Sequence, residues 1–87
     1  MNKNRVCDIF LALANEGNLN LFLQIVDGEK TTKALKSKLS PMPLNRRLNI
    51  LKNSGLITRE VTVEKKNEFI NSMTPLGEKI YNLMTSM

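Results

Sequence analysis

The chain has 87 residues, of which 41% are hydrophobic and 24% charged, so it suits one small globular domain, and a disordered or fibrous protein is excluded. Its longest apolar run, from Ile9 to Ala14, is far shorter than the ~20 residues that a membrane helix needs. One cysteine and no histidine exclude an internal disulfide and a cysteine–histidine metal cluster. No signal segment opens the chain, so we expect a cytoplasmic protein with no membrane partner.

The basic side chains are concentrated in the middle of the chain. Residues 28–66 carry ten lysines and arginines against three glutamates, a net charge of +7, whereas the segments before and after each have a net charge of −1. A strongly positive segment favours a polyanion such as nucleic acid as the partner. The same charges would also suit a lysine-rich surface that only keeps the protein in solution, so charge alone leaves both interpretations open.

Two helices are predicted at the start of the chain. Over residues 3–14, apolar side chains recur at helical spacing on two neighbouring strips. This pattern predicts a helix that buries more than one face, against the core and against a second chain. After a break at residues 15–18, a second helix is predicted over residues 19–26, with Asn18 as its N-cap and Gly28 just past its end.

Two further helices joined by a tight turn are predicted next. Thr31 or Thr32 can cap a third helix that runs to residue 39. Ser40 and Pro41 predict the start of a fourth, because the serine oxygen can accept the amide two residues on and a proline at the first helical position sacrifices no hydrogen bond. This helix ends at residue 53 or 54, before Gly55. The pair forms a helix-turn-helix, residues 31–39 and 41–54.

After Gly55 the hydrophobic period changes from about 3.6 to 2. β-Branched and polar residues alternate over residues 57–63, a polar tip follows at 64–67, and residues 68–73 return, which predicts a β-hairpin. Thr74 and Pro75 predict the start of a last helix, whose apolar stripe is Leu76, Ile80, Leu83, Met84 and Met87. The expected fold is therefore α+β and mostly helical, in the order α-α-α-α-β-β-α, as one compact domain over residues 1–87.

This order of elements, and the residues that fill it, resemble the winged helix-turn-helix transcription regulators. Residues 40–57 are similar to their recognition helix and the entry into the wing, and the likeness covers about residues 7–83. The HxlR group is most similar in the wing and last helix, through Arg59, Glu60, Val61, Glu64 and the run from Ser72 to Gly77. Residues 11–15 with Leu19 look more like the ArsR group, and the turn before Ser40 has the length found in ArsR or MarR proteins. The resemblance implies a winged helix-turn-helix fold that binds double-stranded DNA as a homodimer.

A helical wheel of the fourth helix separates a buried side from an exposed one. Leu44, Leu48 and Leu51 recur at i, i+4 and i+7 and are predicted to face the core. On the other side, asparagine amides and arginine guanidinium groups match the edges of adenine and guanine in the major groove. The residues predicted to read bases are Met42, Pro43, Asn45, Arg46 and Asn49. The alternative is that Arg46 and Asn49 are merely exposed polar residues.

Contacts with the DNA backbone are predicted around this helix. Arg47 and Lys52 are assigned to phosphates. The third helix would cross the DNA backbone and fix the register through Thr31, Thr32, Lys33 and Lys36. On the wing, the resemblance implies contacts with phosphates or an adjacent minor groove by Arg59, Lys65 and Lys66.

The terminal helices carry more apolar surface than a small domain of this shape readily buries. Methionines in such a stripe suit a contact between two chains, although filling the core of the monomer is the competing use. The residues predicted at a homodimer interface are Val6, Phe10, Ile80, Leu83, Met84 and Met87. Cys7 lies in a region where some HxlR regulators carry an oxidant-sensing cysteine, but a small buried apolar residue is the interpretation favoured for it.

An enzyme is not expected from this sequence. The four glycines form no phosphate loop or dinucleotide fingerprint, and no histidine is available as a base, so we predict no catalytic residue, cofactor or metal. We expect a sequence-specific, double-stranded DNA-binding transcription regulator, a homodimeric repressor whose effector the sequence does not identify. Two alternatives stay open: a winged-helix scaffold that binds other proteins, and a nonspecific DNA-coating protein.

Overall fold

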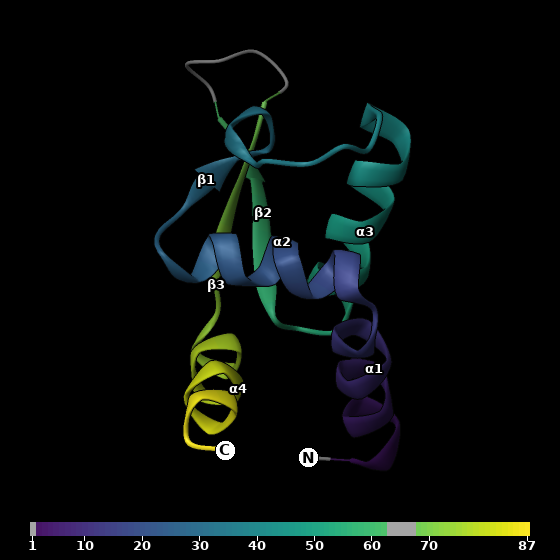
Figure 1. The fold of residues 1–87 in the computed structure, drawn as a ribbon, viewed down its shortest axis with the longest axis vertical. Helices are drawn as coiled ribbons and strands as arrows, with labels where there is room; N and C mark the ends of the chain where they lie inside the picture. Colours follow the sequence, from purple (N-terminus) through teal and green to yellow (C-terminus); the bar gives the residue numbers. More distant parts are fainter. Residues whose placement is uncertain (1, 63–67) are drawn as a thin grey trace.

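The structure, a computed structural model, describes residues 2–62 and 68–87 (Figure 1). These residues form four α-helices, one 3₁₀-helix and a small sheet. In chain order the elements are α1 (Lys3–Ala14), α2 (Glu16–Val26), β1 (Lys30–Thr31), the 3₁₀-helix η1 (Thr32–Ala34), α3 (Pro41–Asn53), β2 (Ile57–Val61), β3 (Phe69–Met73) and α4 (Pro75–Thr85). The predicted α+β, mostly helical class is confirmed.

The strands form one antiparallel sheet in the order β1-β3-β2. β2 and β3 pair from Ile57 opposite Met73 to Val61 opposite Phe69, so the predicted hairpin is confirmed within the described residues. The two-residue strand β1, which is too short to show a hydrophobic period, was not predicted and pairs with the other edge of β3. All three strands meet at Asn71, which lies opposite a β1 residue on one side and a β2 residue on the other.

The core lies between the helices and one face of the sheet. The predicted leucine stripe of α3 is confirmed, since Leu44, Leu48 and Leu51 are all buried. Burial of each such side chain stabilises the fold by roughly 1.5–3 kcal/mol, which holds α3 with its opposite side outward. The whole core cluster consists of Ile9, Ala12, Leu21, Phe22, Ile25, Leu35, Leu44, Leu48, Leu51, Leu56 and Ile57.

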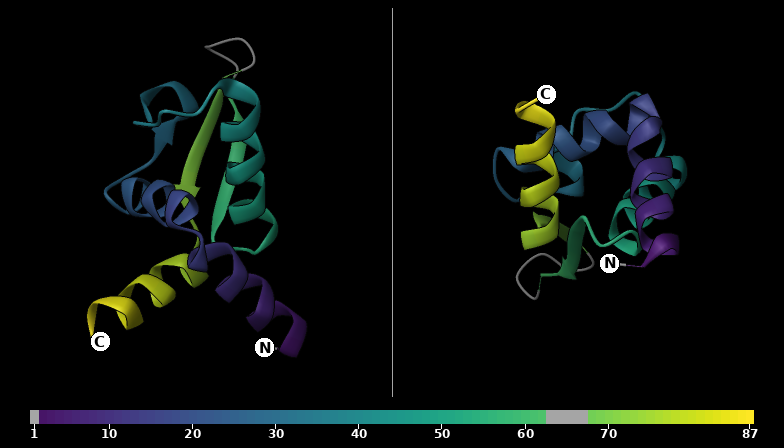
Figure 2. Two further views of the ribbon diagram at one scale, coloured as in Figure 1. Left: turned by 45° about the vertical axis from the view of Figure 1, so that its right-hand side comes forward. Right: turned by 90° about the horizontal axis from the view of Figure 1, so that it is seen from below.

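The two terminal helices extend from the core at the end of the molecule that carries both chain termini. Figure 2 shows α1 and α4 diverging from each other there, in a molecule of 37 × 23 × 23 Å. The N-terminal end of α3 and η1 lie at the opposite end (Figure 1). None of the helices in residues 2–62 and 68–87 is by itself long and apolar enough to cross a membrane, whereas α1 and α2 together, bent by 94°, meet the length and composition of a broken span.

The third helix predicted over residues 31–39 is wrong. The segment instead forms β1 and η1 and then an irregular chain that leads to α3. Gln24 binds the main chain of this segment from α2: its Oε1 accepts the Lys36 N–H at 2.8 Å, and its Nε2 donates to the Lys36 carbonyl at 2.9 Å. Leu35 is the one buried side chain of the segment. So short a segment, with so little apolar surface to bury, cannot offset the cost of helix nucleation.

The caps of α2 and α3 also differ from the prediction. α2 begins at Glu16 because Asn15, rather than Asn18, is its N-cap and accepts the Asn18 amide at 3.1 Å. Ser40 precedes α3 as predicted, but its hydroxyl accepts no hydrogen bond from the helix. Pro43 has no N–H at the third helical position, one of the two that an N-cap side chain can bind.

The predicted start of α4 is confirmed. The Thr74 hydroxyl accepts the amide of Gly77 at 2.9 Å, and Pro75 occupies the first helical position. The same hydroxyl donates to main-chain carbonyl groups of Gly55 and Leu56, so this cap also ties α4 to the segment between α3 and β2.

Candidate nucleic-acid interface

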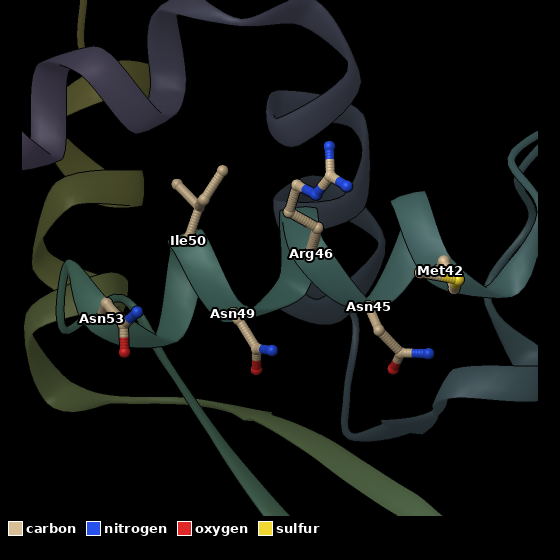
Figure 3. Close-up of a pocket in the computed structure, with 6 residues that line it drawn as sticks. All are labelled: Met42, Asn45, Arg46, Asn49, Ile50 and Asn53. Atoms are coloured by element: carbon tan, nitrogen blue, oxygen red, sulfur yellow. The ribbon is translucent and has the colours of Figure 1, made fainter.

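The outward side of α3 is an open polar surface on a helix whose other side is anchored in the core. It forms a shallow depression of about 450 Å³. Figure 3 shows Asn45 and Asn49 pointing to one side of the helix and Arg46 and Ile50 to the other. The residues that line the depression are Met42, Asn45, Arg46, Asn49, Ile50 and Asn53.

The structure brings the predicted base-reading residues together on this surface. Met42 is 78% exposed, Arg46 and Asn49 are exposed, and Pro43 and Asn45 are half-buried. Arg46 forms no hydrogen bond or ion pair with any residue in the described ranges, so its guanidinium is available to a ligand. That these five side chains contact bases stays a prediction.

Arg59 does not lie where the sequence interpretation placed it. It is not an exposed wing cation: only 8% of the residue is exposed, and its side chain points inward from β2 between the sheet and α3. Its Nη1 donates to Asn49 Oδ1 at 3.0 Å and its Nη2 to Asn45 Oδ1 at 2.8 Å. The reason is the strand period, because Arg59 shares a sheet face with the buried Ile57.

The buried guanidinium of Arg59 is charged. Desolvation by burial lowers the pKa of Arg59 from its ordinary value, but arginine is too basic to lose its proton near neutral pH. Among the described residues, its hydrogen-bond partners are neutral side-chain oxygens on Thr32, Asn45, Asn49 and Asn71. Four of its five N–H donors are thereby used, and the ring of Phe69 lies 4.3 Å from Cζ, which offsets part of the cost of burying the charge.

Three other side chains that were predicted to contact phosphates form hydrogen bonds within the protein. Arg47 Nη1 donates to Asn15 Oδ1 at 2.7 Å and to Asn18 Oδ1 at 3.2 Å, which ties α3 to the start of α2. The Thr31 hydroxyl accepts the Ala34 amide and so caps η1. The Thr32 hydroxyl accepts from the Arg59 guanidinium and from the Asn71 amide. These side chains hold the elements in place, and their contact with phosphates stays a prediction.

The lysines among the predicted backbone contacts are more accessible. Lys33, Lys36 and Lys52 are exposed, and their ammonium groups have no partner within residues 2–62 and 68–87. Lys65 and Lys66 lie outside the described residues. Exposed cations near the open polar face of α3 suit contacts with a phosphate backbone.

Sequence reasoning missed Asn71. It is fully buried at the centre of the sheet, and its Oδ1 accepts from Arg59 Nε at 2.8 Å. A signal was present, since asparagine is depleted in strands and the period places Asn71 on the same face as Phe69 and Met73. A polar residue on the apolar face of a strand indicates a buried hydrogen-bonding partner.

The predicted dimer residues divide into two groups. Phe10, Leu83 and Met87 are 69%, 64% and 100% exposed, so they project from α1 and the C-terminal helix end into solvent. Val6, Ile80 and Met84 are half-buried, and the last two pack against the core. Cys7 is exposed on α1, so the burial favoured for it from the sequence is wrong: α1 projects from the core, and helical spacing puts Cys7 off the strip that is buried through Ile9 and Ala12.

The described residues contain no group of three or more histidine, cysteine, aspartate or glutamate side chains that could hold a metal ion.

Four α-helices and a three-stranded antiparallel sheet in one compact domain, with the short helix η1 before α3, match the winged helix-turn-helix fold of transcription regulators. The model of the HxlR-like helix-turn-helix family matches residues 13–87, and the chain belongs to this family. Family and fold are those of DNA-binding transcription regulators, proteins that are typically not enzymes. No curated protein sequence matches the chain.

Solved structures of transcription regulators share the fold. An ArsR family transcriptional regulator has a TM-score of 0.80 at 14% identity, with 99% of this chain and 88% of that chain covered. MarR has a TM-score of 0.75 at 24% identity, with 95% of this chain covered; this chain spans 65% of the length of MarR. The transcriptional repressor BigR from Xylella fastidiosa has a TM-score of 0.73 at 22% identity, with 97% and 87% covered.

Proposed function

We propose that the chain is a sequence-specific, double-stranded DNA-binding transcription regulator that acts in the cytoplasm as a homodimeric repressor. α3 enters the major groove with its outward face, and Met42, Pro43, Asn45, Arg46 and Asn49 lie nearest the base edges. The observation that carries this proposal is the open polar face of α3, whose depression lies directly opposite the buried leucine stripe. A helix fixed in this way can present its side chains to the groove without reordering.

Charge supports DNA as the ligand. Residues 28–66 have a net charge of +7, and Lys33, Lys36, Arg46 and Lys52 are exposed on or near α3. Lysine and arginine side chains bind phosphates by releasing condensed counterions. If about six phosphates are neutralised, the logarithm of the association constant should fall with the logarithm of the salt concentration at a slope of about −5.

The homodimer is supported by the exposed apolar side chains of the terminal helices. Phe10 of α1 and Leu83 of α4 are exposed, and these two helices lie at the end of the molecule opposite the start of α3 (Figure 1). A two-fold dimer through this end would place two copies of α3 about 34 Å apart, one turn of DNA. The repressor assignment is supported by the likeness to BigR, which is itself a repressor. A regulator that covers two adjacent major grooves would obstruct transcription from an overlapping promoter.

Binding is tested by fluorescence anisotropy across a salt series. One duplex comes from the region upstream of the protein's own gene, and the other is a random duplex of equal length. We expect tighter binding to the upstream duplex with a steep salt slope. Equal, salt-sensitive binding to both would favour a DNA-coating protein, and no binding to either at low salt would favour a protein-binding scaffold.

The role of α3 is tested by Arg46→Ala. Removing an exposed guanidinium that no protein atom in the described ranges holds should leave stability unchanged and weaken binding to the preferred duplex about 10- to 100-fold. Lys79→Ala, which removes an exposed cation from α4, is the matched control and should change affinity little. Equal affinities for the two variants in the anisotropy titration would contradict the assignment of Arg46 to the DNA interface.

A further inference from the structure

A buried cation links β2 to the side chains on the outward face of α3. The Arg59 guanidinium donates to the amide oxygens of both Asn49 and Asn45, at 3.0 and 2.8 Å. Both asparagines line the depression on α3. The cation thus contacts two of the residues assigned to the bases while being itself too buried to reach DNA.

The direction of the guanidinium is fixed by the sheet. Arg59 lies directly opposite Asn71, whose Oδ1 accepts its Nε at 2.8 Å. The Asn71 Nδ2 donates to the Lys30 carbonyl at 3.1 Å and to the Thr32 hydroxyl at 3.2 Å, so this side chain is held as well. The Arg59 Cζ lies over the Phe69 ring, 4.3 Å from its centroid. A group held at its Nε and packed over this ring cannot easily follow the asparagines if they turn away.

Hydrogen-bond chemistry then sets the orientation of the two amides. Arginine has five N–H donors and no acceptor, so the oxygen of each amide must be the atom that faces it. The Asn45 Nδ2 donates back to the Pro41 carbonyl at 2.8 Å. The Asn49 Nδ2 has no partner within the described residues, and Asn49 is exposed. The atom that Asn49 offers to a ligand is therefore an N–H donor.

We infer that Arg59 is a specificity-determining positioning residue, which turns the oxygens of Asn45 and Asn49 inward so that α3 offers amide N–H donors to the base edges. The inference rests on the proposed function, because it concerns how that interface selects a base pair. It differs from a direct DNA contact by Arg59, which its burial prevents.

The orientation changes which bases Asn49 selects. Bidentate pairing with adenine needs both the oxygen and the nitrogen of one amide on the base edge. With the Asn49 oxygen turned to Arg59, the N–H that remains suits acceptor atoms such as guanine O6 and N7 or thymine O4. The cytosine N4 amino group, a donor, is rejected at the same position.

A purely structural role for Arg59 makes a different prediction. If the guanidinium only holds β2 against α3, replacing it lowers stability and weakens binding to every duplex alike. If it orients the amides, replacing it reduces the difference between the correct and the incorrect base pair. The measured quantity must therefore be the ratio of two affinities.

The first experiment compares wild-type protein with Arg59→Lys. Preferred duplexes are selected from a random library with wild-type protein, and anisotropy titrations then measure binding to the preferred duplex and to its single base-pair substitutions. An ammonium group keeps the charge but has only three N–H donors, so it cannot replace the planar guanidinium at all four acceptors. Replacing the base pair that Asn49 reads should lower the affinity of the wild-type protein about tenfold, and this loss is the penalty at that base pair. In Arg59→Lys, we expect the penalty at this base pair to be about threefold or less. Lys52→Met, which removes an exposed cation from α3, should weaken binding to all duplexes alike and leave the penalty at each base pair unchanged.

The second experiment does not depend on the stability of the Arg59 variant. Asn49→Asp keeps an oxygen for Arg59 and replaces the outward N–H donor by a second oxygen. The affinity penalty for substituting the base pair that Asn49 reads should therefore disappear. The control is Asn53→Asp, which adds the same charge one helical turn away, on an exposed asparagine that has no hydrogen bond to Arg59. It should lower the affinity for every duplex and leave the penalty at each base pair unchanged.

The outcomes separate this inference from the proposed function. If Arg59→Lys, folded by circular dichroism, keeps the full wild-type penalties, Arg59 does not set specificity, although sequence-specific binding stands. Should Arg59→Lys not fold, full wild-type penalties in Asn49→Asp would still contradict the inference, because Asn49 would then offer no donor that selects a base. If the library yields no preferred sequence with wild-type protein, sequence-specific binding is wrong and this inference is wrong with it.

Discussion

Asn71 is fully buried, and each polar atom of its side chain has a protein partner. Its oxygen accepts from Arg59, and its nitrogen donates to the Lys30 carbonyl and the Thr32 hydroxyl. A buried network of this kind stabilises the fold only when it is complete, because a group that loses its partner inside the protein cannot turn to water.

Replacing Asn71 by leucine should therefore be strongly destabilising. Leucine has a similar volume but leaves the Arg59 Nε and the Lys30 carbonyl without partners, so we expect the free energy of unfolding to fall by about 3 kcal/mol. Urea unfolding followed by circular dichroism measures this change. The same substitution at the exposed Asn53 should change stability by less than about 0.5 kcal/mol, and equal effects at both positions would contradict the importance of the buried network.

Single side chains were predictable from the sequence where a local period decided their environment. Leu44, Leu48 and Leu51 follow helical spacing and are all buried. Arg59 follows strand spacing with Ile57, so its inward direction was also present in the sequence, but the family resemblance implied a contact with phosphates or the minor groove instead. The partners that stabilise the buried charge come from three other elements, and no local pattern identifies them.

At the scale of elements, α3 and the segment before it show what a helix needs. α3 has a proline at its first position, three buried leucines and a Gly55 at positive φ after its end, and its predicted bounds are confirmed. The segment 31–39 has a threonine cap but little apolar surface, and the Gln24 side chain binds its main chain instead. A cap alone does not make a helix when tertiary contacts do not bury one of its faces.

α4 is joined to the domain by a close approach at Gly77. A Cβ on this residue would meet the Leu56 carbonyl oxygen and the Met73 sulfur. The Leu56 carbonyl cannot retreat easily, because it accepts hydrogen bonds from both the amide and the hydroxyl of Thr74. Glycine is therefore required here by packing, not by its backbone angles.

Gly77→Ala should lower the free energy of unfolding by about 1–3 kcal/mol, even though alanine is the better helix former. Gly17→Ala is the matched control within α2, where the nearest atom to the added Cβ is the Asn15 Oδ1 at 3.2 Å. A shift of a few tenths of an ångström relieves this contact, but Asn15 Oδ1 also accepts from the Asn18 amide and from Arg47, so we expect a change in stability smaller than at Gly77. Thermal and urea unfolding of both variants provide the measurement, and a stabilised Gly77→Ala would contradict the close approach.

At the scale of the whole molecule, the two proposed interfaces lie at opposite ends. α1 and α4 extend at the end with both termini, and α3 begins at the other end (Figure 1). Dimerisation through α1 and α4 would therefore leave the polar face of α3 open. It would also couple DNA affinity to the concentration of the protein, because only the dimer contacts two half-sites.

Leu83→Lys should convert the dimer to a monomer at micromolar concentration. Leu83 is 64% exposed in the single chain, so the charge should leave the folded monomer intact but oppose burial between two chains. Val61→Lys places the same residue at an exposed apolar position of β2 and should leave the dimer intact. Sedimentation velocity distinguishes the two variants, and a wild-type protein that sediments as a monomer would overturn the homodimer.

The sequence by itself determined the mostly helical α+β class, the bounds and buried stripe of α3, the hairpin and the start of α4. Each of these depends on residues a few positions apart, through helical or strand periods, caps and prolines. The tertiary structure alone decided that β1 joins the sheet, which side chains hold the guanidinium of Arg59, and that the oxygens of Asn45 and Asn49 face inward. Those features depend on hydrogen bonds between distant positions, such as Arg59 with Thr32 and Asn71 with Lys30, and their partners are chosen by packing.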